Sequence, residues 1–318
     1  MHPTPKRLGR PSSGSALSGA ERQRRYRERQ KSRHSDANTP ASILVTRNEK
    51  TGNPEHRQLF AIPTPKPSDS TALAVPQLPE PRTVTGDREV DAVLWLRDLC
   101  KHAREVSVLD RALEAASRIT APMEDLERRY TDWLSRQPGA HPLAVALSRI
   151  GEIEGHVTHA RQRIRLHAEG LAIFGSYETA MSDTAPERML ADTAALPEDF
   201  DGWSRLGMDA LAEVFARSVN PATLAECASE LRYWDWLYQI RARMTETEHP
   251  GAYAGDEEPV VSARREYIEG LLTVLAPIDR QEAIHLADAL KAGLVDIGSV
   301  DDGTRRAEIL EHLLRTAP

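Results

Sequence analysis

Apolar residues recur with the period of an α-helix from Asp87 to the end of the chain. Residues three or four positions apart share one face of a helix, so this spacing predicts amphipathic helices. The positions that follow it are Ala92, Trp95, Leu96, Leu99 and Ala103; Leu126, Tyr130, Trp133 and Leu134; Leu224, Cys227, Leu231, Trp234 and Tyr238; Ile284, Ala287 and Leu290; and Ala307, Leu310, Leu313 and Leu314. No run after Gly86 alternates like a strand. The pattern therefore predicts an all-α, multi-helix body over residues 87–318.

Capping residues indicate where some of these helices begin. A short polar side chain at a helix start accepts hydrogen bonds from free backbone amides, and proline is tolerated in the first turn. Such signals are Ser107 with Asp110, Thr120 with Pro122, and Asn220 followed by Pro221.

A heptad-like pattern is the most regular feature of the body, and it predicts one long helix around residues 142–172. Its apolar seam comprises Leu143, Ile150, Ile153, Val157, Ile164 and Leu171. The same spacing serves either a self-association seam, as in a homo-oligomer, or a core helix packed within one chain. Gly151 and Gly155 weaken the helix, since each costs about 1 kcal/mol relative to alanine. Both uses remain open.

Residues 37–86 have the composition of a proline-rich linker, with eight prolines between Pro40 and Pro81. Such a segment favours extended conformations. It contains two β-prone runs, Ile43–Arg47 and Gln58–Ile62, around a turn-like stretch at Thr51–Pro54. These predict either a small β-hairpin over residues 43–62 or a tether without regular structure. A lone hairpin would need support from the body, because two strands are marginal in water.

Residues 1–36 form a basic arm whose residues 18–33 carry seven Lys/Arg against two Glu. Ser18 and Glu21 have the spacing of a capping box, which predicts a helix that begins at Ser18. At 100° per residue the basic side chains fall on two opposite sides and leave no apolar face for a core. Such a helix suits a DNA major groove between two phosphate backbones. The residues predicted to bind nucleic acid are Arg22, Arg24, Arg25, Tyr26, Arg27, Arg29, Lys31 and Arg33.

The charge is strongly segregated along the chain. Residues 1–33 contain ten Lys/Arg and two Asp/Glu, a net charge of +8, so the other 285 residues carry −15 of the total of −7. This asymmetry favours contact with a polyanion. The alternatives are a solvated charged tail, a basic address read by transport machinery, or an incidental tail on a helical protein-interaction scaffold.

Gly9-Arg10-Pro11, followed by the run from Leu17 to Arg29, resembles the basic leader of many plasmid- and phage-borne bacterial proteins. The resemblance covers about a tenth of the chain. It implies a DNA-binding accessory protein of a mobile genetic element that acts in maintenance, transfer or gene regulation. The same residues also resemble the arginine-rich peptides of phage antiterminators, which bind an RNA hairpin. DNA is therefore the expected partner and RNA the alternative.

The sequence indicates a non-enzymatic protein without a cofactor. The phosphate-binding, dinucleotide-binding, serine-hydrolase and zinc-protease motifs are missing from the sequence. Glu152, His156, His159 and His167 have helical spacing, but no further ligand is evident, so we expect no metal site. Cys100 and Cys227 are far apart in apolar surroundings, as in a reduced cytoplasmic protein. No run approaches the length of a membrane span, so we expect no membrane partner.

Two further clusters have more than one interpretation. Arg161, Arg163 and Arg165 alternate along the heptad region and either form a solvated face or extend a nucleic-acid footprint. Four aromatic residues fall within six positions, and they either pack in the core or contact a protein partner: Tyr233, Trp234, Trp236 and Tyr238. Consecutive residues on a helix cannot all face the same way, so some must leave the first packed layer.

Overall fold

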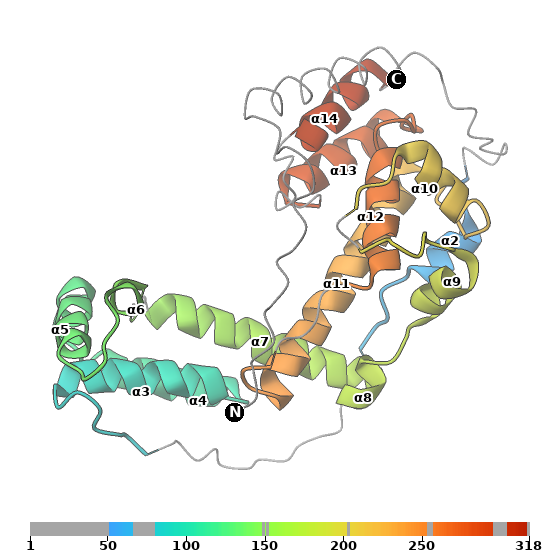
Figure 1. The fold of residues 1–318 in the computed structure, drawn as a ribbon. Coiled ribbons are helices and arrows are strands. Elements are labelled where there is room, and N and C mark those ends of the chain that lie inside the picture. Colours follow the sequence, from blue (N-terminus) through green and yellow to red (C-terminus); the bar gives the residue numbers. More distant parts are fainter. Residues whose placement is uncertain are drawn as a thin grey trace, which may run out of the picture. The chain divides into compact units, whose positions relative to one another are not determined.

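The computed structural model describes residues 51–65, 80–147, 150, 153–201, 204–252, 257–294 and 304–316 (Figure 1). All of them belong to one compact unit, Arg47–Pro318. The regular elements of these residues are helices, and none is a strand. This confirms the predicted all-α body. The predicted basic arm and residues 43–50 of the predicted hairpin lie outside the described residues.

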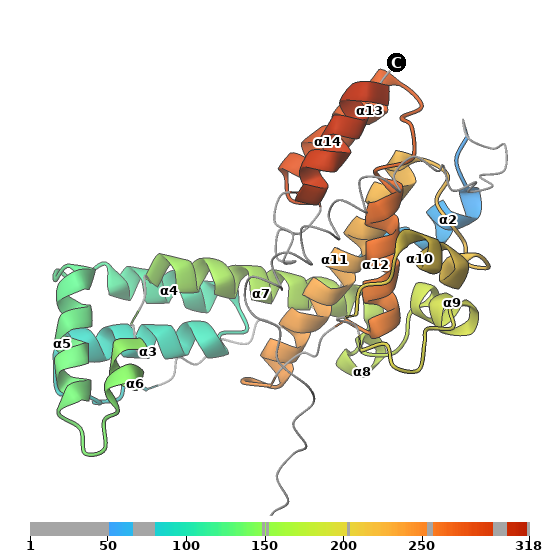
Figure 2. The ribbon, with the colours of Figure 1, turned by 45° about the horizontal axis from the view of Figure 1, so that its top comes forward.

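The first group of helices packs around α7, Ile153–Phe174. Helices α3 (Arg88–His102) and α4 (Val106–Ala116) lie along α7, and α5 (Met123–Ser135) packs on α3 (Figures 1 and 2). The buried apolar residues that join them include Leu96, Leu99, Leu109, Val157 and Ile164. The helical period predicted the apolar faces of Leu96 with Leu99 and of Val157 with Ile164, while Leu109 was not among the predicted positions.

The second group is built around α11, Leu224–Glu248, which also packs directly on α7. Its other elements are α8 (Tyr177–Ala180), α9 (Ala185–Thr193), α10 (Met208–Phe215), α12 (Pro259–Leu271), α13 (Arg280–Lys291) and α14 (Thr304–Thr316). Their shared core includes Phe215, Leu231, Trp234, Leu286 and Ile309. Helix α11 therefore contacts both groups of helices, which its own sequence does not indicate.

Several helices begin a few residues from their predicted starts. The N-cap residue of α4 is Glu105 rather than Ser107, and that of α5 is Pro122. Thr223, not Asn220, caps α11 and accepts a hydrogen bond from the amide of Glu226. Asn220 is not free to cap that helix, because its side chain contacts α12 and the end of α10.

The single long helix predicted around residues 142–172 is wrong in extent. Pro142–Leu147 forms a separate short helix, α6, and α7 begins only at Ile153. Ile150 lies between the two helices and is completely buried against Val90, Val93 and Leu126. The two glycines at positions 151 and 155 lower the helix propensity of this region, and burying Ile150 compensates for the break.

The residues of the predicted seam pack mainly within the chain. Ile150, Val157 and Ile164 are buried in intramolecular clusters, and Ile153 is partly buried beside them. Leu143 and Leu171, at the two ends of the seam, are 62% and 38% exposed. The continuous free face that a self-association seam requires is therefore not present, and intramolecular packing is the use that the structure shows.

The predicted strand over Gln58–Ile62 is also wrong. Pro54–Leu59 forms the short helix α2, whose N-cap Asn53 accepts hydrogen bonds from the amides of Glu55 and His56. Pro54 occupies the first turn, where its missing N–H costs nothing. Phe60, which follows α2, is buried in the core of the second group. These residues belong to the helical body, so the interpretation of the whole linker as a tether is corrected as well.

Candidate functional site

All residues predicted to bind nucleic acid lie outside the described residues. They are Arg22, Arg24, Arg25, Tyr26, Arg27, Arg29, Lys31 and Arg33. The first described element after them is α2, and the segment Gly52–Phe60 that contains it packs on the body. We call this segment the anchor segment.

Glu226 on α11 holds the start of the anchor segment. Its Oε1 accepts a hydrogen bond of 2.6 Å from the backbone N–H of Asn53, and its Oε2 accepts one of 2.8 Å from the N–H of Ala222. The guanidinium of Arg57 lies 3.3 Å from the same carboxylate. The side-chain amide of Asn53 also donates to the carbonyl of Asn220 at 2.9 Å. One carboxylate thus joins the anchor segment to the residues that precede α11.

Gly52 permits this close approach. Its φ of +72° lies in the left-handed region, which only glycine enters without strain. A Cβ at this position would lie 2.3 Å from Oε1 of Glu226. Backbone conformation and space therefore both require glycine here.

Glu230, one helical turn after Glu226, binds the anchor segment from the interior. Nε2 of His56 donates to Glu230 Oε2 at 2.7 Å, and Nε of Arg264 on α12 donates to Oε1 at 2.7 Å. The three side chains are each 0% exposed. Arg264 also donates to the side-chain oxygen of Asn220 at 2.7 Å and to the carbonyl of Val219 at 2.9 Å. This buried cluster connects α2, α11 and α12.

The cluster keeps Glu230 ionised inside the protein. Burial acts to raise the pKa of the Glu230 carboxyl, but the charge of Arg264 and the hydrogen bond from His56 outweigh it, so the pKa lies below its usual value. A buried carboxylate is tolerated only when it is paired and hydrogen-bonded in this way. Nδ1 of His56 is buried without a hydrogen-bond partner among the described residues. Among the described residues the ring is hydrogen-bonded through Nε2, and it packs against Phe60 with 4.7 Å between the ring centroids.

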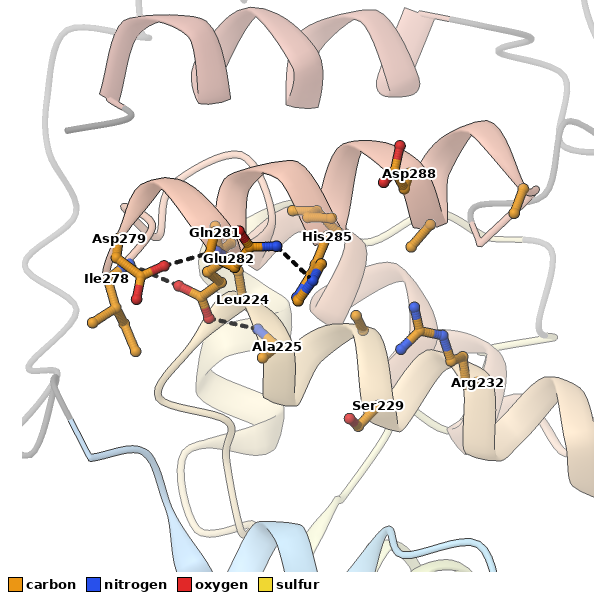
Figure 3. Close-up of a pocket in the computed structure, with 14 residues that line it drawn as sticks. Leu224, Ala225, Ser229, Arg232, Ile278, Asp279, Gln281, Glu282, His285 and Asp288 are labelled. Atoms are coloured by element: carbon orange, nitrogen blue, oxygen red, sulfur yellow. Dashed lines mark hydrogen bonds between the residues drawn. The ribbon is translucent and has the colours of Figure 1, made fainter.

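A groove of about 640 Å³ lies between α11 and α13 (Figure 3). Its floor is apolar and consists of the buried side chains of Leu224, Ala228, Leu286 and Ala289. Glu282 closes one end, because its carboxylate accepts hydrogen bonds from the backbone amides of Ala225 and Ile278 at 2.8 and 2.7 Å. The rim is polar: Figure 3 shows Ser229 and Arg232 on α11 opposite His285 and Asp288 on α13.

The three alternating arginines of α7 have different surroundings. Arg163 is 1% exposed and donates to the carbonyls of Cys100 and Ala103, at the end of α3, and to the hydroxyl of Thr247. It is therefore a structural residue and cannot contact nucleic acid. Arg161 is exposed and pairs with Asp110, while Arg165 is exposed to solvent.

The histidines of α7 form contacts within the fold. His159 and His167 donate to Glu246 and Glu248 near the end of α11, at 2.9 and 2.7 Å. His156 contacts the carbonyl of Ile150 at 3.2 Å. Among the described residues no group of three or more His, Cys, Asp or Glu side chains is arranged to hold a metal ion. Cys100 and Cys227 are buried free thiols, and burial raises the pKa of both.

The aromatic run on α11 is divided between the core and its edge. Tyr233 and Trp234 are 4% and 0% exposed and are packed edge-on against Phe60. For these two residues the structure shows core packing, and not the alternative of contact with a protein partner. Trp236 and Tyr238 are half-buried, and the indole N–H of Trp236 donates to Glu169 on α7 at 3.0 Å.

The sequence analysis did not predict the contacts of Glu226 and Glu230 with the anchor segment, although local signals for them exist. Asn53-Pro54 is a helix-start signal of the kind recognised at Asn220-Pro221. Glu226 and Glu230 lie beside the apolar stripe of α11, and a carboxylate in that position indicates a buried partner. The partner itself is more than 170 positions away.

Comparison of the chain with protein-family models, with curated proteins and with solved structures finds no significant match. None of the described helices has the length and apolar character needed to cross a membrane.

Proposed function

We propose that this protein binds DNA through its arginine-rich N-terminal arm, as a non-catalytic accessory or regulatory protein of a mobile genetic element. The observation that carries the proposal is the segregation of charge: +8 on residues 1–33 against −15 on the remainder. Lys and Arg side chains that replace counterions along the phosphate backbone supply most of non-specific DNA affinity. The resemblance of the arm to the leaders of plasmid- and phage-borne proteins supports the biological setting.

The anchor segment gives the arm a defined point of attachment in this proposal. Arg33 is 18 residues before Thr51, and a chain of that length spans at most roughly 65 Å when fully extended, since each residue adds at most about 3.6 Å. An acidic body repels the phosphate backbone, and at about 0.1 to 0.15 M salt this repulsion decays over a Debye length of about 8 to 10 Å. This reach allows the arm to occupy a groove while the body remains beyond that distance.

Binding of the full chain to a labelled DNA duplex tests the proposal. Replacing Arg22, Arg24 and Arg25 by alanine should weaken binding by about tenfold or more at physiological salt, because each loses a phosphate contact. Arg161→Ala, which removes an exposed arginine of the body, should leave the affinity within about twofold. Equal affinity of the arm variant and the unmodified chain would refute the proposal. If an unlabelled hairpin RNA displaces the labelled duplex at a lower concentration than unlabelled duplex DNA does, RNA is favoured as the partner.

A further inference from the structure

A second pocket, of about 490 Å³, lies between α3, α5 and residues 80–84, which precede α3. It belongs to the first group of helices and shares no residue with the groove between α11 and α13. Its volume lies within the range of small-molecule sites, about 300 to 1,000 Å³. Among the described residues, the side chains that give its walls their chemistry are Glu80, Arg82, Leu94, Trp95, Asp98 and Tyr130.

Two sets of contacts hold the walls of this pocket together. The buried carboxylate of Asp91 on α3 accepts hydrogen bonds from the amide and the hydroxyl of Thr85, at 2.7 and 2.8 Å, and one of 3.2 Å from the amide of Gly86. Arg129 on α5 donates to Asp87, the N-cap residue of α3, at 2.9 Å. The walls are therefore fixed before a ligand arrives, which lowers the entropy cost of binding.

Two of the walls are aromatic. Trp95 on α3 and Tyr130 on α5 are each partly buried and pack against the core clusters beneath them. The ring of Tyr130 also stacks on that of Trp133, with 6.0 Å between the ring centroids and 16° between the planes. The face of an aromatic ring attracts a cation, and tryptophan does so most strongly. Leu94 adds an aliphatic surface beside these rings.

The charges of the lining favour a cation as well. Glu80 and Asp98 contribute two carboxylates and Arg82 one guanidinium, so these three side chains carry a net charge of −1. Oδ1 of Asp98 lies 3.5 Å from Nε2 of His102, yet the Asp98 side chain is 60% exposed and can still approach a ligand. A methylated ammonium group suits this combination, because its methyl groups contact the rings while a carboxylate balances its charge.

We propose that the pocket between α3, α5 and residues 80–84 binds a methylated ammonium group, with Trp95 and Tyr130 as aromatic walls and Asp98 and Glu80 as the balancing charges. A small quaternary amine and a methylated lysine side chain of a partner protein both present this group. The inference is independent of the proposed function, since no residue of the arm takes part in the pocket.

Isothermal titration calorimetry of the full chain with choline tests the pocket. We expect saturable binding in the millimolar range, because few atoms of so small a cation make contact. The uncharged alcohol in which carbon replaces the nitrogen of choline has the same shape, and it should bind at least tenfold more weakly. A short peptide that contains trimethyllysine distinguishes the two sources of the group. Binding at least tenfold tighter than that of choline assigns the pocket to a protein side chain, and comparable binding assigns it to a small amine.

Charge variants locate the binding site. Asp98→Asn should weaken choline binding about threefold to fivefold, whereas Arg82→Gln should strengthen it, because the two substitutions remove charges of opposite sign. Asp132→Asn is the matched control: it removes an exposed carboxylate of α5 that does not line the pocket, so the affinity should stay within about twofold. The proposal is overturned by choline binding that does not saturate by about 50 mM, by equal affinity for the uncharged alcohol, or by an Asp98→Asn chain with unchanged affinity.

Discussion

His56 donates a hydrogen bond of 2.7 Å to Glu230, a residue 174 positions later in the chain, and neither side chain is exposed to solvent. This contact places a six-residue helix, too short to be stable alone, on the principal helix of the body. The anchor segment is therefore held on the body at a fixed place, and its contacts there have measurable consequences.

Removing the imidazole should destabilise the body. In His56→Ala the buried Glu230 loses a charge-assisted hydrogen bond and a cavity forms beside Phe60, so we expect the free energy of unfolding to fall by about 3 kcal/mol. Urea unfolding followed by circular dichroism measures it. His102→Ala is the control, because His102 is half exposed and its Nε2 lies 3.5 Å from Asp98. Equal stabilities of the two variants would contradict the anchoring role of His56.

The ion pair of Glu230 and Arg264 should behave as a coupled unit. Glu230→Met leaves the guanidinium buried without its carboxylate, and we expect a loss of about 3 to 5 kcal/mol. The double variant Glu230→Met/Arg264→Met removes both charges and should be less destabilised than the single variant. A double-mutant cycle in urea measures the coupling. Additive losses would show that the two side chains act independently.

Gly52 and Gly139 form a matched pair, because their φ angles are +72° and +80°. A Cβ on Gly52 would collide with Glu226, whereas one on Gly139 meets nothing within 4 Å. Gly139→Ala should therefore cost only the backbone strain, about 1 to 2 kcal/mol. Gly52→Ala should cost more, since Glu226 must also give up its contact with Asn53. If thermal unfolding shows equal losses of stability for the two variants, the clash of the new Cβ with Glu226 is relieved without loss of stability.

The sequence predicted the amphipathic helices α3, α4, α5, α11, α13 and α14, because each of them depends on neighbouring residues. Spacing alone located the apolar faces of α3, α5 and α11. The prediction failed where distant parts of the chain decide the structure. Gln58–Ile62 has a β-prone composition, yet the Asn53 cap and the burial of Phe60 produce a helix followed by a core contact. The break before Ile153 arises because Ile150 is buried against α3 and α5, which no heptad pattern indicates.

The site was less predictable than the fold. The arm is recognisable from charge and capping, which are local properties. Glu226 and Glu230 acquire their roles only because Gly52–Phe60 folds back onto α11. The groove likewise needs α11 and α13 side by side, although 31 residues (249–279) separate them in the sequence.

Acid should destabilise the body through Glu187. Burial acts to raise the pKa of this carboxyl, but hydrogen bonds from Arg241 and Thr184 lower it by more, so the folded-state pKa lies below the unfolded value. Its contribution to stability is then fully present above the unfolded pKa of about 4.3 and disappears as the pH falls through the folded value. Glu187→Gln should be destabilised at pH 7, and the difference from the unmodified chain should shrink toward pH 3. The exposed Glu213→Gln should follow the unmodified chain in urea unfolding at every pH.

The central claim, that the arm binds DNA through its arginines, is tested most directly by the salt dependence of DNA affinity. The logarithm of the association constant falls with the logarithm of salt concentration with a slope of about −0.9 per neutralised phosphate. Replacing five arm arginines by alanine should flatten the slope by roughly 4.5. Those five are Arg22, Arg24, Arg25, Arg27 and Arg29. Replacing five exposed arginines of the body should leave the slope unchanged; these are Arg88, Arg111, Arg118, Arg136 and Arg165. A slope that is unchanged by the arm substitutions, or flattened equally by the body substitutions, would contradict the account.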